Sequence, residues 1–208
     1  MRKRTQRLKA RSRAMTLVEI VIGAAIAAVL GVGIVYLLVN VARQQRIAFI
    51  ETQVAKRADL LEDKIMDILR NASRNNVVPF SVSDAVPGQV SGQEVFFYRI
   101  IFRSADNAPN QELRFDPTTR QLIYDPDRSV ANNEQRLDGA TGASNLTRLE
   151  YVWFASGILP TGSLDNSLIL VQLEVNDQGL ARRSFRDPTK RSNWIIATRS
   201  FAVNLRRY

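Results

Sequence analysis

The stretch that decides the fold is residues 15–42, MTLVEIVIGAAIAAVLGVGIVYLLVNVA. From Ile20 to Ala42 it contains 23 residues without a charged side chain, and most of them are Ile, Val, Leu or Ala. At about 1.5 Å per residue, a helix over these 23 residues reaches roughly 34 Å, which is enough to cross the hydrocarbon core of a bilayer. The sequence therefore predicts a transmembrane helix over residues 15–42.

Basic side chains crowd the segment that precedes this helix. Seven of the 29 Lys and Arg residues lie in residues 1–14, which contain no Asp or Glu. Only Arg43 and Arg46 follow the apolar run closely, so the positive-inside rule predicts a cytoplasmic N-terminus and an extracytoplasmic remainder. Without residues 1–14, the formal net charge falls from +9 to +2. The leader therefore explains most of the basicity of the chain.

A cleavable secretory signal is the alternative interpretation of this N-terminus. Its small-residue cleavage site would be Ala25-Ile26-Ala27. Cleavage there would leave the apolar residues 28–42 at the new N-terminus, and it would place Glu19 inside the hydrophobic region of the signal. Both consequences fit a secretory signal poorly.

The helical period continues after Ala42. Apolar residues recur at steps of three and four with charged residues between them, at Ile47, Ile50, Val54, Ala58, Leu61, Ile65, Ile68 and Ala72. This pattern predicts an amphipathic continuation of the helix over residues 43–73, with one apolar stripe packed on a sheet. The predicted fold class is α+β: a long N-terminal helix packed against a C-terminal antiparallel β-sheet.

The β-rich domain is predicted over residues 74–208, where short β-rich segments alternate with turn signals. Residues 112–116 and 121–125 flank Pro117-Thr118-Thr119-Arg120, which predicts a hairpin with a four-residue loop. Two stretches rich in Pro, Gly and polar residues, 75–93 and 127–144, are predicted to be surface loops. The other predicted strands are residues 94–103, 146–154, 168–175 and 195–205.

The composition argues against an enzyme. The chain has no cysteine and no histidine, so thiol nucleophiles, the usual serine triad and most zinc ligand sets are ruled out. The sequence contains no phosphate-binding Gly-rich loop and no nucleophile elbow. We therefore expect no catalytic residues, no cofactor and no bound metal. Asp116, Asp125 and Asp127 could bind calcium, but beside Pro117 and Pro126 they are better explained as turn residues.

The order of features at the N-terminus resembles the processing signal of type IV prepilins and pseudopilins. A basic leader is followed by the small residue Ala14, then Met15, then Thr16-Leu17-Val18-Glu19 and the apolar helix. In that family, prepilin peptidase cuts before the residue that corresponds to Met15 and methylates the new N-terminal amine. The resemblance therefore implies cleavage between Ala14 and Met15, N-methylation of Met15, and a recognition motif formed by Thr16, Leu17 and Val18.

The same resemblance implies a role for Glu19 in filament assembly. A carboxylate in an apolar membrane helix costs up to about 3 kcal/mol unless it is compensated. In the family, the new N-terminal amine of one subunit pairs with the carboxylate at the position of Glu19 on a neighbouring subunit. The alternative is that Glu19 lies only about 6 Å from the start of the helix and is solvated near the headgroups.

The resemblance implies a structural subunit of a type IV pilus or a type II secretion pseudopilus. Its expected partners are prepilin peptidase, other pilins or pseudopilins, an inner-membrane assembly platform and membrane lipid. The predicted hairpin and closing strand are more similar to a minor pilin or a J-type minor pseudopilin than to a major pilin. The implied location is the inner membrane, with residues 74–208 outside the cytoplasm.

Two further functions stay open at this stage. The first is a minor pilin that acts as an adhesin or a DNA-binding tip protein, and the second is a single-pass membrane enzyme or sensor. Nucleic acid is not the expected partner, because arginines on an edge strand also discourage unwanted strand pairing. The basic residues in question are Arg182, Arg183, Arg186, Lys190, Arg191, Arg199, Arg206 and Arg207.

Overall fold

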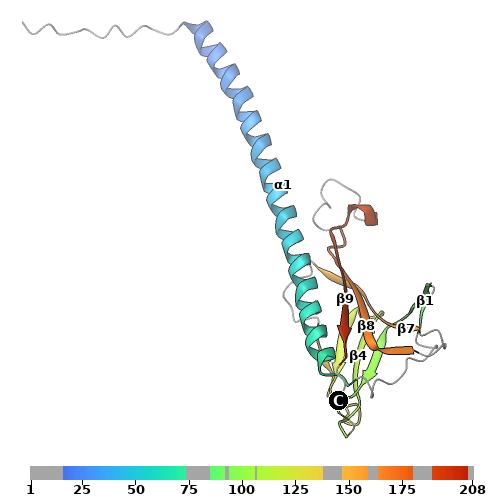
Figure 1. Ribbon diagram of the computed structural model, residues 1–208. Coiled ribbons are helices and arrows are strands. Elements are labelled where there is room, and N and C mark those ends of the chain that lie inside the picture. The colour runs from blue at the N-terminus through green and yellow to red at the C-terminus, as the bar shows by residue number, and fades with distance from the viewer. Residues whose placement is uncertain are drawn as a thin grey trace, which may run out of the picture. The chain divides into compact units, whose positions relative to one another are not determined.

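The computed structural model describes residues 16–73, 85–91, 94–105, 107–137, 147–158, 164–179 and 189–205. The chain divides into two compact units, residues 1–45 and 46–208. A single helix, α1 (Leu17–Arg70), runs from the first unit into the second (Figure 1). The elements that follow it are β1 (Ala85–Ser91), β2 (Glu94–Phe97), β3 (Arg99–Phe102), β4 (Gln111–Asp116), β5 (Gln121–Asp125), β6 (Gln135–Arg136), β7 (Arg148–Ile158), β8 (Leu164–Asn176), the 3₁₀ helix η3 (Arg191–Asn193) and β9 (Ile196–Asn204).

The α+β fold class is confirmed, with the apolar stripe of α1 buried as its period predicts. Every fourth or third residue of the C-terminal half of the helix is buried. The buried helix residues share one core with side chains of both sheets, among them Phe102, Leu113, Phe154 and Val171. The stripe consists of Ile50, Val54, Ala58, Leu61, Ile65 and Leu69.

Polar contacts hold α1 on both flanks of this stripe. On one flank, Arg199 of β9 contacts Asp59 (Nη2 to Oδ1, 2.7 Å) and lies 3.7 Å from Glu62. On the other flank, Lys64 Nζ donates to the Leu137 carbonyl (2.9 Å) and Arg57 donates to the carbonyl of Thr147 (2.6 Å). The helix is therefore fixed by a buried apolar seam between two lines of charged side chains.

The helix ends three residues earlier than predicted. The last turn tightens, because the Ala72 N–H donates to the Leu69 carbonyl (2.9 Å). The Ser73 N–H then donates to the Arg103 carbonyl (2.7 Å), next to the end of β3. Residues 71–73 therefore leave the helix because the chain at Ser73 pairs with the backbone that follows β3.

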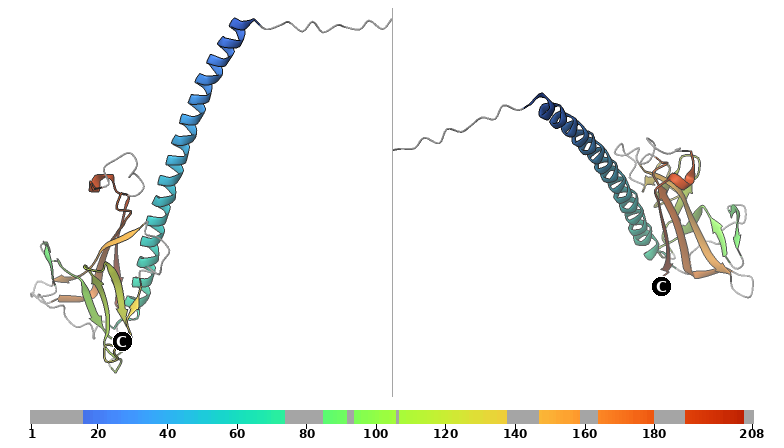
Figure 2. Two further views of the ribbon diagram at one scale, coloured as in Figure 1. Left: turned by 180° about the vertical axis from the view of Figure 1, so that it is seen from behind. Right: turned by 90° about the horizontal axis from the view of Figure 1, so that it is seen from above.

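The β-region forms two antiparallel sheets where the sequence predicts one. The first has the order β1-β2-β7-β8-β9, and the second has the order β3-β4-β5-β6. Figure 2 shows the β-region from two further sides. The strand predicted over residues 94–103 is interrupted at Tyr98: Phe97 pairs with Phe154 of β7, whereas Arg99 pairs with Arg114 of β4. The chain therefore changes sheet at a single residue.

The predicted hairpin is present, and the two predicted loops contain short strands. Strands β4 and β5 pair from Glu112–Asp125 to Asp116–Gln121, and Arg120 has a positive φ of 55° at the end of the turn. The stretch 75–93 includes β1, an edge strand in which Pro87 and Gly88 are tolerated because only one side pairs. The stretch 127–144 includes the two-residue β6.

Candidate functional site

The first candidate site is the N-terminus of α1, where four predicted site residues lie. Thr16 precedes the helix, and Leu17, Val18 and Glu19 form its first three positions. The Thr16 N–H donates to Glu19 Oε2 (2.9 Å), and the Glu19 N–H donates to Thr16 Oγ1 (3.3 Å). This reciprocal pair is a capping box, which satisfies two backbone donors at the helix end. Ala14 and Met15 lie outside the described residues.

The capping box gives Glu19 a partner within its own chain. Its carboxylate accepts a hydrogen bond from a backbone N–H at the positive end of the helix dipole, where a negative charge is favoured. The sequence signal for this arrangement is Thr-x-x-Glu directly before an apolar run, and our sequence interpretation used these residues only as a processing motif. Capping and intersubunit pairing are therefore two separate roles to test at Glu19.

The apolar half of α1 is not covered by the described part of the chain. The side chains from Leu17 to Val39 are all exposed, with Val29 at 73% and Leu30 at 61%. Among the described residues, α1 is long and apolar enough to cross a membrane. Such an apolar surface on a helix requires lipid or another apolar partner to cover it.

The glycines of this half have no structural role inside the chain. A Cβ atom added at Gly23, Gly31 or Gly33 would meet no atom within 4 Å. The chain's own packing therefore does not require glycine at these positions. Any requirement for small residues there must come from a neighbouring molecule, because small residues let membrane helices approach closely.

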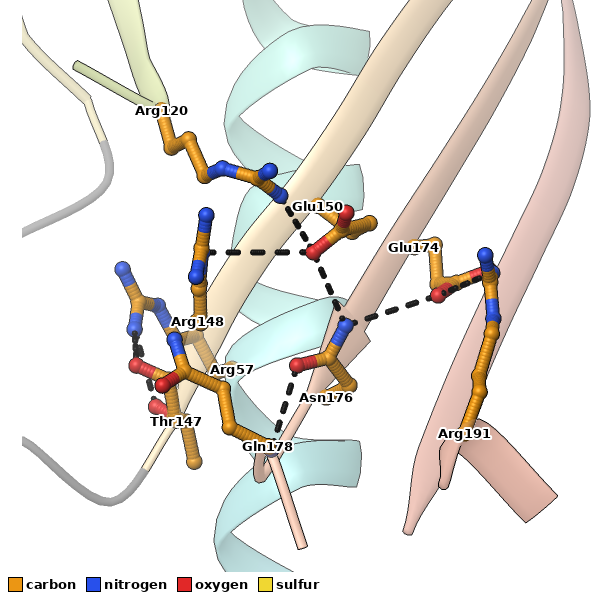
Figure 3. A network of polar contacts seen from close by, with 9 residues as sticks. All are labelled: Arg57, Arg120, Thr147, Arg148, Glu150, Glu174, Asn176, Gln178 and Arg191. Atoms are coloured by element: carbon orange, nitrogen blue, oxygen red, sulfur yellow. Dashed lines mark hydrogen bonds and ion pairs between the residues drawn. The ribbon is translucent and has the colours of Figure 1, made fainter. Parts of the chain in front are cut away.

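The second candidate site is a polar network in the β-domain, drawn in Figure 3. At its centre is Glu150, which lies at an irregularity of β7 between Leu149 and Tyr151. A bulge of this kind redirects a side chain. The Glu150 carboxylate forms an ion pair with Arg120 of the β4–β5 turn and accepts a hydrogen bond from Asn176 Nδ2 (3.2 Å). It therefore connects the two sheets.

The network continues to the connection before β9. Asn176 is fully buried, and its Nδ2 also lies 3.5 Å from Glu174 Oε1. The Glu174 side chain is only 5% exposed and accepts two hydrogen bonds from Arg191 Nη2 (2.7 and 2.6 Å). Asp177 is also fully buried, and its Oδ1 accepts from the Ile195 N–H (2.8 Å). These contacts attach η3 and its flanks to β8.

The electrostatics of the network favour an ionised Glu150. Burial alone would raise the pKa of Glu150, but hydrogen bonds from Arg120 and Asn176 outweigh burial, together with the positive charges of Arg120 and Arg148. The pKa of Glu150 is therefore lowered from its ordinary value of 4.5. This site has the chemistry of a structural ion-pair network, because its charged groups are paired with one another.

The three aspartates near the hairpin act as turn residues. Asp116 accepts hydrogen bonds from the Thr119 hydroxyl (2.7 Å) and the Thr118 N–H (2.8 Å), and these bonds lower its pKa. Asp125 accepts from the Asp127 N–H (3.1 Å), and Asp127 accepts from Ser129. The described residues contain no group of three or more Asp or Glu side chains arranged to hold a metal ion.

Comparison with known proteins adds no family assignment. No protein-family model matches the sequence, and no curated protein or solved structure is similar to the chain. The functional argument therefore rests on the residues and the geometry described above.

Proposed function

We propose that the chain is a prepilin-like structural subunit, cut by prepilin peptidase between Ala14 and Met15 and methylated at Met15. It is then held in the inner membrane and assembled with other pilins or pseudopilins into a type IV pilus or a type II secretion pseudopilus. Its place is that of a minor pilin or a J-type minor pseudopilin. The proposal assigns it no enzymatic activity.

One observation carries this proposal: α1 is a single helix of 54 residues with two different surfaces. Its first half is apolar and uncovered, as a subunit needs if it is stored in lipid and then packed helix to helix in a filament. Its second half is built into the core of a β-domain. The described helix begins at Leu17, the third residue after the proposed cleavage bond.

Mass spectrometry of the mature N-terminus tests the proposal. We expect a start at N-methyl-Met15 in cells with an active prepilin peptidase, and retention of residues 1–14 in matched cells without it. Ala14→Gly, which restores the glycine usual in the family, serves as a positive control for cleavage. Residues 1–14 retained in the presence of the peptidase would favour the membrane enzyme or sensor. A start near Ala28 would identify a secretory signal.

Two substitutions separate the roles of Glu19. Glu19→Ala removes both the capping acceptor and the negative charge, whereas Glu19→Gln keeps an acceptor for the Thr16 N–H and removes only the charge. If the charge pairs with the amine of a neighbouring subunit, both variants are cleaved normally and both are lost from sheared filaments. Normal incorporation of Glu19→Gln would exclude the charge-pairing role and leave capping as the function of Glu19.

A further inference from the structure

A polar pocket of about 540 Å³ lies between the β3–β4 connection and the segment after β5. Its size is within the usual range for small-molecule sites. The side chains used below are Arg103 and Asn110 from the first segment, and Asp127, Arg128 and Ser129 from the second. The Arg128 N–H donates to the Asn110 carbonyl (2.9 Å), so a backbone hydrogen bond joins the two walls of the pocket.

One end of each of three lining groups is already fixed. Asn110 Oδ1 accepts a hydrogen bond from Arg103 Nε (2.5 Å). Asp127 Oδ1 accepts from the Ser129 N–H (3.0 Å) and the Ser129 hydroxyl (2.6 Å). Arg128 Nε lies 2.8 Å from Glu112 Oε2, and the Glu112 side chain is only 7% exposed. Such anchoring pre-orients the amide, the carboxylate and the guanidinium before any ligand arrives.

The other end of each group remains available. Asn110 Nδ2, Asp127 Oδ2 and the two Nη atoms of Arg128 make no hydrogen bond to a described residue. The amide and the guanidinium supply donors, and the carboxylate supplies an acceptor. The lining of the pocket therefore offers both donors and an acceptor, and each of them is held by a contact at its opposite end.

The charge balance selects the class of ligand. Arg103, Arg128 and Asp127 all line the pocket, and Glu112 contacts Arg128, so positive and negative groups are mixed in the lining. A simple anion would be repelled by the carboxylate of Asp127, and a simple cation would be repelled by the guanidinium groups of Arg103 and Arg128. A neutral ligand with adjacent groups that both donate and accept satisfies all three available ends. Vicinal hydroxyls of a sugar have this property.

We propose that this pocket binds a saccharide through a pair of neighbouring hydroxyls. One hydroxyl accepts from Asn110 Nδ2 and donates to Asp127 Oδ2, and the other accepts from Arg128 Nη. A ligand that lacks one of these hydroxyls loses a hydrogen bond to one of the three oriented groups, and its affinity falls accordingly.

The pocket lies at the end of the domain where α1 terminates. The Ser73 N–H donates to the carbonyl of Arg103, a pocket residue (2.7 Å). The helix enters this unit at Arg46, about 36 Å away along its axis at its usual rise. The inference itself concerns the β-domain and does not depend on cleavage or filament assembly.

Two isosteric exchanges test the pocket. Asp127→Asn keeps an Oδ1 for Ser129 and replaces the available acceptor by a donor, and Asn110→Asp keeps an Oδ1 for Arg103 and replaces the available donor by an acceptor. The full-length chain is labelled with ¹⁵N in dodecylphosphocholine micelles, whose headgroup carries no sugar. It is then titrated with cellotetraose or chitotetraose. In the wild type we expect saturable shifts of the Asn110 side-chain amide signal and of the Ser129 backbone amide signal. The Ser129 signal, which every variant retains, should report at least about tenfold weaker binding in each variant.

The matched control is Asn132→Asp, the same chemical change at an exposed residue of a different pocket, which should leave the affinity unchanged. An unshifted Ser129 amide signal in Asp127→Asn checks that the turn is intact. The proposal is overturned if neither sugar gives saturable shifts, if glycerol gives the same shifts, or if both exchanges leave the affinity unchanged. Shifts with sodium acetate or phosphate but not with sugars would identify an anion site instead.

Discussion

The two halves of α1 are one continuous helix with opposite environments. In the N-terminal half, residues 17–45, side chains such as Leu30 (61%) and Leu37 (63%) are largely exposed. In the C-terminal half, residues 46–70, Leu61 and Ile65 are 2% exposed or less. The first half is apolar on all sides, whereas the second half alternates an apolar stripe with charged side chains. The sequence pattern therefore predicts that the first half needs lipid or another helix as its apolar partner, whereas the second half packs against its own chain.

The comparison shows which contacts stabilise each half. The second half is held by its own chain, through the shared core and the flanking contacts of Arg57, Lys64 and Arg199. The apolar side chains of the first half are exposed from Leu17 to Val39, and its first turn is closed by the capping box at Thr16 and Glu19. A helix of this kind depends on lipid or on neighbouring helices. Substitutions should therefore have different effects in the two halves.

The largest expected effect is in the buried stripe. Leu61→Ala removes a side chain that is 2% exposed and should lower the free energy of unfolding of the β-domain by about 2 to 5 kcal/mol. The adjacent Leu60 is 51% exposed, so Leu60→Ala should change the free energy of unfolding by less than about 0.5 kcal/mol. Urea unfolding in detergent, followed by tryptophan fluorescence, reports on this domain because both tryptophans lie in it. Equal effects of the two substitutions would contradict the packing.

The next-largest expected effect is on membrane insertion. Here a substitution in the first half should matter, and one at an exposed position of the second half should not. Val29→Lys places a charge in the uncovered apolar half and should oppose membrane insertion by about 3 kcal/mol. Leu60→Lys makes the same kind of change at an exposed position of the second half and should leave both insertion and stability unchanged. Carbonate extraction of membranes measures insertion, and tryptophan fluorescence measures stability. If Val29→Lys stays in the membrane fraction like the wild type, the expected difference between the two halves is contradicted.

Local sequence patterns predict both halves of the helix well, because the pattern and its consequence lie on the same residues. The apolar run marks the first half, and the period of Ile50, Val54 and Ala58 marks the buried face of the second. The β4–β5 hairpin also follows from its strand pattern and its turn residues, and the alternation in residues 195–205 predicts the strand β9. The capping box corresponds to the pattern Thr-x-x-Glu before an apolar run, and the same residues also form the proposed processing motif.

Features that depend on distant partners could not be read from local patterns. Residues 94–103 have a continuous strand pattern, and only pairing with Phe154 and Arg114 divides them between two sheets. Glu150 looks like an ordinary strand residue until a bulge turns it toward Arg120. The polar pocket forms only because the Arg128 N–H reaches the Asn110 carbonyl. Each of these features depends on contacts that the sequence around it does not specify.

A smaller effect tests the acid sensitivity of the second unit. Glu150→Gln removes the charge that pairs with Arg120 and should destabilise the β-domain by about 1 to 3 kcal/mol at neutral pH. Because the folded-state pKa of Glu150 is lowered, its contribution is present above pH 4.5 and is lost as the pH falls through the folded-state pKa. The destabilisation by Glu150→Gln should therefore shrink in acid, as measured by urea unfolding at several pH values.

The matched control for Glu150 is Glu134→Gln. Glu134 also pairs with an arginine, Arg114 at 2.7 Å, but both side chains are exposed by 39% or more. Exposed ion pairs contribute about 0 to 1 kcal/mol, so this substitution should have little effect at any pH. An effect of Glu150→Gln that is equally large at neutral and acid pH would show that shape or hydrogen bonding, and not charge, matters at Glu150.

The smallest expected effect lies at the start of the N-terminal half, where the capping box closes the first turn of α1. Thr16→Val keeps the shape of the side chain but removes the acceptor for the Glu19 N–H, and it should weaken the first turn by about 1 kcal/mol. Thr16→Ser keeps the acceptor and should behave like the wild type. Amide hydrogen exchange at residues 18–20 of the full-length chain in micelles measures the fraying. Because the cap is remote from the core, tryptophan-detected unfolding should not change, and a variant that altered both readouts would mean that the two halves of the helix are coupled.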